Sequence, residues 1–335
     1  MNAAALMAGN LIVTWPAVFA ALGAGCAMLL TMALWLWRGR SPLPLGIFFP
    51  TAVLFALVLG RLVHWYSHPL LYAGFPQAMT VYHQGGFSLS GAALGVLLSA
   101  ALCRAAGLID SLSAALDALA PAGAMGLAVG RLGSLFDLSD RGRFALTTPA
   151  LQRLPFAVWT ETAGGAGEWR LAVFMLQCLV CALLALLLTA AYLRGRREGT
   201  VFRLFLVLYG AAEIWLDSAR YDADFFRFNG FIHINQILCL AAVLLSAAWS
   251  TADRSRQGGL RPFHAVCWGV LALSLAGAGW MEYFVQRRPD RCALGYALMA
   301  AALLLAAVCA AILAAERETT PPARPGKRKK PEKPV

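Results

Sequence analysis

The chain has 335 residues, of which 60% are hydrophobic and only 13% are charged. Soluble domains carry about 25% charged residues, so this composition excludes a soluble fold and predicts a membrane protein. The formal net charge is +11, but all the lysines lie in the Pro-rich segment 319–335. This charge therefore indicates a basic tail, and we expect no nucleic-acid partner.

Apolar stretches of near-constant length recur along the whole chain. A membrane core about 30 Å thick requires roughly 20 apolar residues for each helical span. We predict an all-α polytopic membrane protein with about nine transmembrane helices. The expected spans are approximately 11–37, 46–66, 86–106, 111–134, 170–192, 201–217, 231–250, 263–285 and 292–315.

The connections between these spans alternate in charge. Arginines follow the first, third, fifth and seventh spans, whereas segments 67–85, 135–169 and 218–230 are longer and richer in His, Asp and Gly. The positive-inside rule then places the N-terminus outside and the C-terminus in the cytoplasm. We expect a seven-helix domain (1–255), two additional helices (256–318) and a disordered basic tail (319–335) that contacts anionic lipid. Segment 135–169 is expected to be an irregular loop.

Arg131 is the strongest candidate for function, because ionisable groups at span ends are costly to keep there. Gly130 and Gly133 flank it, and small residues let a helix or a lipid headgroup approach the backbone. A guanidinium fork in such a place suits a phosphate. The alternative is an arginine that extends to the membrane surface from a helix end.

Arg61 also follows a glycine near a span end, and His64 and His68 share its helical face. This face could meet a headgroup, although interfacial histidines are also ordinary belt residues, and we favour that interpretation for His64. His83, in the next loop, could titrate near neutrality. A lone loop histidine is more often a surface residue.

Glu213, Asp217 and Arg220 are spaced by four and three residues and therefore share one helical face. Two acids at this spacing repel unless a cation lies near them. Arg220 can pair with Asp217, and Glu213 could reach Arg131 or Arg61. A structural ion-pair network explains this pattern as well as catalysis does.

The sequence predicts neither a metal site nor a cofactor. Cys178 and Cys181 form a CxxC, but it lies inside an apolar span without a second pair or a nearby histidine. Helix packing is therefore the better interpretation of these two cysteines.

Several segments, taken in chain order, resemble the prolipoprotein diacylglyceryl transferase family. The chain is similar to it over roughly residues 11–250. The segments are LGRLVHWYSHP, GGFSLSGAALG, GRLGSLFDLSDRGR, YGAAEIWLDSARYD and HINQILCL. The third resembles the family signature, Gly-Arg-Leu-Gly-Asn with a Gly-Arg about ten residues later.

The resemblance implies transfer of the diacylglyceryl group of phosphatidylglycerol to a cysteine thiol in the lipobox of a prolipoprotein signal peptide. It further implies a multi-pass protein of the bacterial inner membrane with its site facing the outer leaflet. Phospholipid would be held by arginines at the matching positions, which are Arg61, Arg131, Arg143 and Arg220.

The chain departs from the family pattern at several positions. Ser90 stands where the family has a histidine, Ser134 and Asp137 replace asparagines, and Glu213 replaces an arginine. The thiol still requires a base. His83, His233 and Asp137 remain candidates beside Ser90, which fills the family's histidine position, while Glu213 and Asp217 are expected to form structural ion pairs.

Two further functions stay open. Ser90 and Glu213 favour a family member with altered or lost catalysis that binds phospholipid or acts as a scaffold. The buried ions would also suit a small-molecule transporter. Transporters usually contain internal repeats, which this sequence does not show, so that function ranks last.

Overall fold

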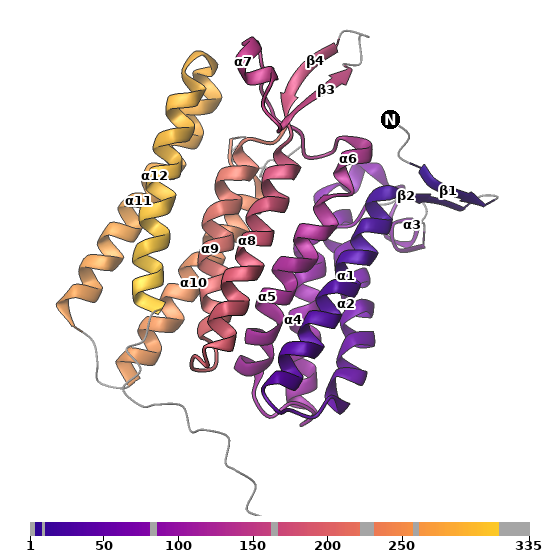
Figure 1. Cartoon of the computed structure of the whole chain (residues 1–335), viewed down its shortest axis with the longest axis vertical. Helices are drawn as coiled ribbons and strands as arrows, with labels where there is room; N and C mark the ends of the chain where they lie inside the picture. Colours follow the sequence, from indigo (N-terminus) through magenta and orange to yellow (C-terminus); the bar gives the residue numbers. More distant parts are fainter. Residues whose placement is uncertain are drawn as a thin grey trace, which may run out of the picture.

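The computed structural model describes residues 4–8, 11–80, 86–161, 167–221, 231–256 and 261–314. Within these ranges nine long helices form the bulk of the molecule and run up and down side by side (Figure 1). They are α1 (Trp15–Trp37), α2 (Leu43–Ser67), α4 (Leu89–Ala105), α5 (Leu112–Arg131), α8 (Val173–Leu193), α9 (Thr200–Ser218), α10 (Ile234–Arg256), α11 (Pro262–Arg287) and α12 (Cys292–Ala314).

Seven of the described helices are long and apolar enough to cross a membrane, and α4 is a shorter apolar helix. Leucines on several helices point outward, with Leu29 73% and Leu273 77% exposed. Such surfaces are typical of helices that face lipid. The prediction of an all-α polytopic membrane protein is confirmed, and each expected span overlaps one of the nine long helices that the structure describes.

Several short helices and strands lie at the end of the bundle that contains the C-terminus of α5 (Figure 1). They are η1 (Pro69–Leu71), α3 (Phe75–Thr80), α6 (Ser134–Asp137), α7 (Pro149–Gln152), η3 (Pro289–Arg291) and the strands β1 (Ala4–Ala8), β2 (Leu11–Thr14), β3 (Ala157–Glu161) and β4 (Gly167–Leu171). The strands form two antiparallel hairpins, β1–β2 and β3–β4.

These hairpins correct two expectations. The first span was expected to begin at about residue 11, but Leu11–Thr14 is a strand and the helix begins at Trp15, where Pro16 supplies a preset first-turn φ. The connection 135–169 is not an irregular loop, because β3 pairs with β4 from Ala157↔Leu171 to Glu161↔Gly167.

The helices pack in close pairs because glycines face their neighbours. Gly91 and Gly95 of α4 lie against the backbone of Leu59 and Phe55 in α2. A Cβ at either position would overlap that backbone. Gly126 of α5 meets Gly23 of α1 in the same way. Small residues at these positions therefore let the helix backbones approach closely.

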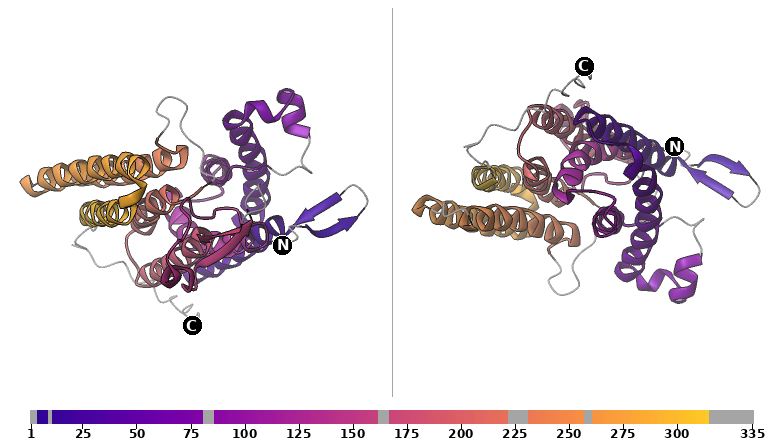
Figure 2. Two further views of the ribbon diagram at one scale, coloured as in Figure 1. Left: turned by 90° about the horizontal axis from the view of Figure 1, so that it is seen from above. Right: turned by 90° about the horizontal axis from the view of Figure 1, so that it is seen from below.

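The additional helices α11 and α12 join the core of the bundle. One buried apolar cluster contains Val207 of α9, Val243 of α10, Leu271 of α11 and Met299 of α12. Figure 2 shows α11 and α12 lying along one side of the bundle, with α9 and α10 between them and the rest of the molecule.

A buried acid links α5 to α9 at the opposite end from the hairpins. The carboxylate of Asp117 is 2% exposed and accepts hydrogen bonds from the backbone N–H groups of Gly199 (2.7 Å) and Phe202 (2.8 Å). These groups start α9, whose first turn has no partners of its own. Asp117 thus caps α9 from another helix.

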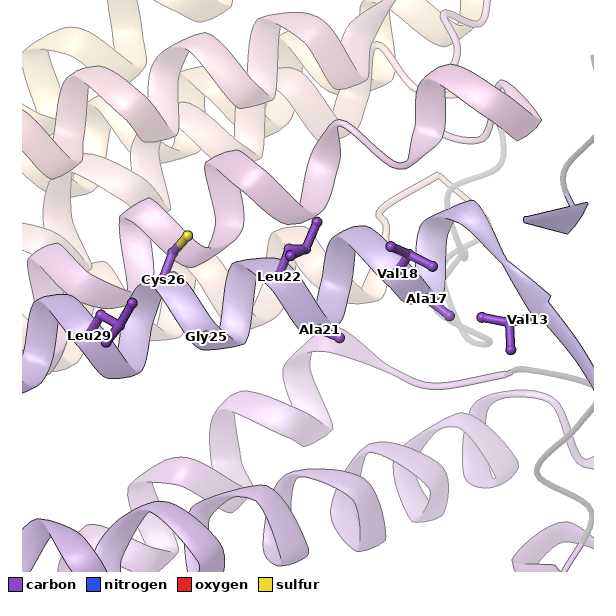
Figure 3. A pocket seen from close by; sticks show the side chains of 8 residues that line it. All are labelled: Val13, Ala17, Val18, Ala21, Leu22, Gly25, Cys26 and Leu29. Atoms are coloured by element: carbon purple, nitrogen blue, oxygen red, sulfur yellow. The ribbon is translucent and has the colours of Figure 1, made fainter. Parts of the chain in front are cut away.

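An apolar groove runs along α1 (Figure 3). Its lining comes from one residue of β2, Val13, and from α1: Ala17, Val18, Ala21, Leu22, Gly25, Cys26 and Leu29. Gly133, two residues after Arg131, lies against the backbone of Pro16. The Val13 end of the groove is therefore at the same end of the bundle as Arg131.

Candidate functional site

The C-terminal ends of α5 and α9 meet the N-terminal end of α10 at the hairpin end of the bundle (Figure 1). Their polar side chains form what we call the ion cluster: Arg131, Asp140, Gln177, Glu213, Asp217, Arg220, His233 and Asn235. Most of it is buried, with Glu213 2%, Asp217 1% and His233 1% exposed.

Two arginines converge on one carboxylate in this cluster. Arg131 Nη1 forms an ion pair with Asp140 Oδ2, and Arg220 Nη2 forms one with Asp140 Oδ1. The side chains of Arg131 and Arg220 keep 17% and 16% of their surface exposed. A carboxylate held by two guanidinium groups occupies a place that a phosphate oxygen also fits.

The chain around Asp140 is unusual. Leu138 and Asp140 have φ of 57° and 58°, the left-handed region that residues with a side chain rarely adopt. The segment continues as an extended piece tied to its neighbours, since Gly142 N donates to Leu171 O (2.6 Å) and Arg143 N to Ala219 O (2.8 Å). These bonds hold the strained turn against the end of α9.

Glu213 lies deeper, on α9. Its Oε1 accepts hydrogen bonds from Gln177 Nε2 (2.9 Å) and Asn235 Nδ2 (3.1 Å) and lies 3.5 Å from Arg131 Nη2. The expectation that Glu213 reaches an arginine of another helix is met by Arg131. A buried charge with this many partners is retained at much lower cost than an unpaired one.

Asp217 is held between a cation, an amide and a histidine. Its Oδ1 lies 3.2 Å from both Arg220 Nη1 and Asn235 Nδ2, and its Oδ2 lies 2.9 Å from His233 Nδ1. Asn235 donates to both Glu213 and Asp217 and so separates the two acids. The carboxylate also fixes the orientation of the His233 ring.

The charges of the cluster do not favour a further anion. Two guanidinium groups, Arg131 and Arg220, face three carboxyl groups, Asp140, Glu213 and Asp217. A phosphate that enters this site must therefore compete with Asp140 for the guanidinium groups.

The other predicted phospholipid-binding arginines lie in different surroundings. Arg61 is fully buried, donates from Nε to Ala78 O (2.5 Å) and from Nη1 to Gly86 O (2.9 Å), and stacks on Tyr72. It ties the end of α2 to the following loop. Arg143 follows Asp140 in the same extended segment, and its Nη1 is buried without a hydrogen-bond partner in the described residues.

The candidate bases are spread over the same end of the molecule. Ser90, in the first turn of α4, lies 2.8 Å from the hydroxyl of Ser88. Asp137 accepts from Ser139 N (2.9 Å) and Ser139 Oγ (2.7 Å), which makes it a local turn residue. His83 lies outside the described residues. Among the candidates described, His233 is the one held in the ion cluster.

Sequence reasoning missed Asp140, Gln177 and Asn235. Asp140 and Asn235 belong to segments that were quoted for the resemblance, but only the fold shows that they face Arg131 and Asp217. Gln177 is an amide inside an apolar span, and this was the signal that could have found it.

Comparisons with known proteins match the chain to one family. A sequence model of the family described as "Prolipoprotein diacylglyceryl transferase" matches residues 3–251. A phosphatidylglycerol–prolipoprotein diacylglyceryl transferase of Gloeobacter violaceus is 27% identical over 265 residues, 74% of this chain and 93% of that relative. Proteins of the same name from Trichormus variabilis (28% over 191 residues, 53% of this chain and 63% of the relative) and Streptomyces avermitilis (29% over 231 residues, 67% and 65%) also match.

The matched region contains every residue of the ion cluster, from Arg131 to Asn235, and ends inside α10. This chain belongs to the prolipoprotein diacylglyceryl transferase family.

Proposed function

We propose that this protein is a membrane transferase that moves the diacylglyceryl group of phosphatidylglycerol to the cysteine thiol of a prolipoprotein lipobox. The observation that carries the proposal is the convergence of Arg131 and Arg220 on one oxyanion position, next to a histidine oriented by Asp217. The names of the relatives support the same two substrates.

The reaction requires a thiolate and a leaving phosphate. The sulfur attacks the diacylglyceryl carbon that is bonded to the phosphodiester oxygen, a sulfur–carbon bond forms, and the carbon–oxygen bond breaks. Its electron pair goes to the phosphate, which leaves as glycerol phosphate with one more negative charge than the diester had. Guanidinium groups stabilise charge that develops in this way more than they stabilise the bound lipid.

Arg131 and Arg220 supply those guanidinium groups, and Arg143 adds a buried nitrogen that has no hydrogen-bond partner among the residues the structure describes. His233 takes the thiol proton. Because Nδ1 faces Asp217, this transfer runs through Nε2, with the carboxylate stabilising the imidazolium that forms. Ser90, Asp137 and His83 have no step in this scheme.

The lipid would lie with its phosphate at the ion cluster and an acyl chain in the groove along α1. The groove is apolar and begins at the level of Arg131. With the predicted orientation, this end of the bundle faces the outer leaflet of the bacterial inner membrane, and the basic tail contacts anionic lipid on the cytoplasmic side.

The test is transfer of labelled diacylglyceryl from phosphatidylglycerol to a synthetic lipobox peptide by the purified protein. Arg131→Ala is expected to abolish transfer. Arg104→Ala, an exposed arginine in the last turn of α4, is the matched control and is expected to leave it intact.

Absence of transfer by the wild-type protein would contradict the proposed transferase activity. If the wild-type protein then binds phosphatidylglycerol in an Arg131-dependent manner, the second candidate, a phospholipid-binding relative, replaces it. Ser90 at the family's histidine position and Asp140 between the two arginines are the observations that favour this second candidate.

A further inference from the structure

The additional helices α11 and α12 lie beyond the part of the chain that matches the family, yet they place a buried acid at the end of α10. Glu282 of α11 is 3% exposed. Its Oε2 accepts a hydrogen bond from Gln236 Nε2 (2.9 Å), and its Oε1 accepts one from Gln286 Nε2 (2.7 Å). A carboxylate inside a membrane helix is costly and therefore points to a role.

Gln236 connects Glu282 to the ion cluster. It is the third residue of α10, and its Oε1 accepts a hydrogen bond from the backbone N–H of His233 (3.0 Å), the residue just before the helix. This is one half of a capping box. Because a carboxylate only accepts, Glu282 requires the NH₂ group of Gln236 to face it, and this turns the Gln236 oxygen toward His233. The same NH₂ group also donates to Ile214 O at the longer distance of 3.3 Å, so Glu282 is the closer and charged acceptor of the two.

Gln286 holds the same turn from its other side. Its Nε2 donates to Phe231 O (2.6 Å) while it also donates to Glu282. The ring of Tyr283 packs edge-on against Phe231 with centroids 5.7 Å apart. The negative charge of Glu282 also lies near the N-terminal end of α10, where the helix dipole favours it.

We propose that Glu282 is a positioning residue for His233, acting through Gln236, so that the two additional helices complete the site of the transferase. The inference rests on the proposed function for its catalytic consequence, but the positioning itself is a structural statement. The series of contacts runs from Glu282 to Gln236, to the backbone of His233, and through the His233 ring to Asp217.

The kinetic test compares full-length Glu282→Gln, Gln236→Leu and the double variant in the transfer assay. A second amide at position 282 can donate as well as accept, so the charged acceptor is lost and the Gln236 NH₂ group keeps only the longer hydrogen bond to Ile214 O (3.3 Å). We expect Glu282→Gln to lower kcat about tenfold, the size of effect of one charge-assisted hydrogen bond, with KM for phosphatidylglycerol unchanged.

If Glu282 acts through Gln236, the double variant is no slower than Gln236→Leu alone. Trp268→Phe is the matched control, because it removes another hydrogen bond between α11 and α10, Trp268 Nε1 to Thr251 Oγ1 (3.0 Å), at the far end of the helices. It is expected to leave kcat unchanged. Additive losses in the double variant, or an equal loss in Trp268→Phe, would overturn the positioning role.

A second measurement does not depend on transfer. Amide hydrogen exchange of the peptide covering 231–237 is expected to rise in Glu282→Gln and to stay at the wild-type level in Trp268→Phe. If hydrogen exchange of this peptide rises in Glu282→Gln but the wild-type protein transfers no diacylglyceryl group, the positioning role of Glu282 is supported and the proposed function is contradicted. If transfer is present but neither exchange nor kcat responds to Glu282→Gln, the positioning fails alone.

Discussion

Asp140 is the residue whose chemistry most directly opposes lipid binding. Its two oxygens engage Arg131 and Arg220, the groups proposed to hold the phosphate, from a backbone with positive φ. An anionic lipid must displace it or bind beside it.

Asp140→Asn is therefore expected to lower KM for phosphatidylglycerol severalfold, because it removes a competing charge while preserving the shape of the side chain. The measurement is the dependence of transfer rate on lipid concentration in mixed micelles. Asp137→Asn, in the same segment but bonded to Ser139, is the control. An unchanged or raised KM in Asp140→Asn would show that Asp140 organises the arginines and does not compete for them.

Arg131 also has a structural role, since Glu213 is buried behind it. Arg131→Gln leaves this carboxyl with two amide partners and is expected to cost about 3–5 kcal/mol of stability. Adding Glu213→Gln should restore a large part of the loss, because the uncompensated charge is then removed. Denaturant unfolding in detergent measures both variants. Equal stabilities of the single and double variants would rule out this coupling.

Residue spacing in the sequence predicted which side chains share a helical face, but it did not predict contacts between side chains of different segments. The i, i+4, i+7 pattern of Glu213, Asp217 and Arg220 placed them on one face, and a partner arginine for Glu213 followed from the repulsion between the acids. The partners Asp140, Asn235 and Glu282 come from three other segments. Their contacts depend on how the helices cross, which no local pattern encodes.

At the level of elements, apolar stretches in the sequence located the nine long helices that the structure describes, and seven of these are long and apolar enough to cross a membrane. The apolar pattern did not predict the two hairpins, β1–β2 and β3–β4. Leu11–Thr14 is as apolar as the helix that follows it, and the helix start was marked by Trp15-Pro16 instead. In β3–β4 the pairing of two short strands left too little apolar periodicity to detect.

The contact between α2 and α4 yields a prediction about helix packing. Gly95→Ala is expected to destabilise the protein by about 1–3 kcal/mol, because the added methyl group meets the backbone of Phe55. Gly123→Ala in α5 is the opposite case, since nothing lies within 4 Å of the added Cβ. There the higher helix propensity of alanine should stabilise by up to about 1 kcal/mol. Thermal unfolding of the two variants checks the difference, and a stable Gly95→Ala would contradict the close approach.

At the scale of the whole molecule, the arginine distribution predicts which end of the bundle faces the cytoplasm. Leu151 in α7 lies at the ion-cluster end, and Arg194, after α8, lies at the other end; both are exposed. We expect Leu151→Cys to react with a membrane-impermeant thiol reagent in intact spheroplasts, and Arg194→Cys to react only after permeabilisation. The reverse labelling would invert the orientation and place the site on the inner leaflet. The wild-type chain, with its own cysteines, sets the background.

The cap that Asp117 provides for α9 has a consequence for how the protein is made. The acid and the first amide it binds are separated by 82 residues, so at about 10 residues per second the ribosome needs roughly eight seconds to deliver the partner. During that interval the two backbone N–H groups that bind Asp117 in the folded protein have not yet been synthesised. Because Asp117 lies near the start of α5, its carboxylate can remain hydrated at the membrane surface during this time. We therefore expect α5 to reach its final position only after the start of α9 has been synthesised.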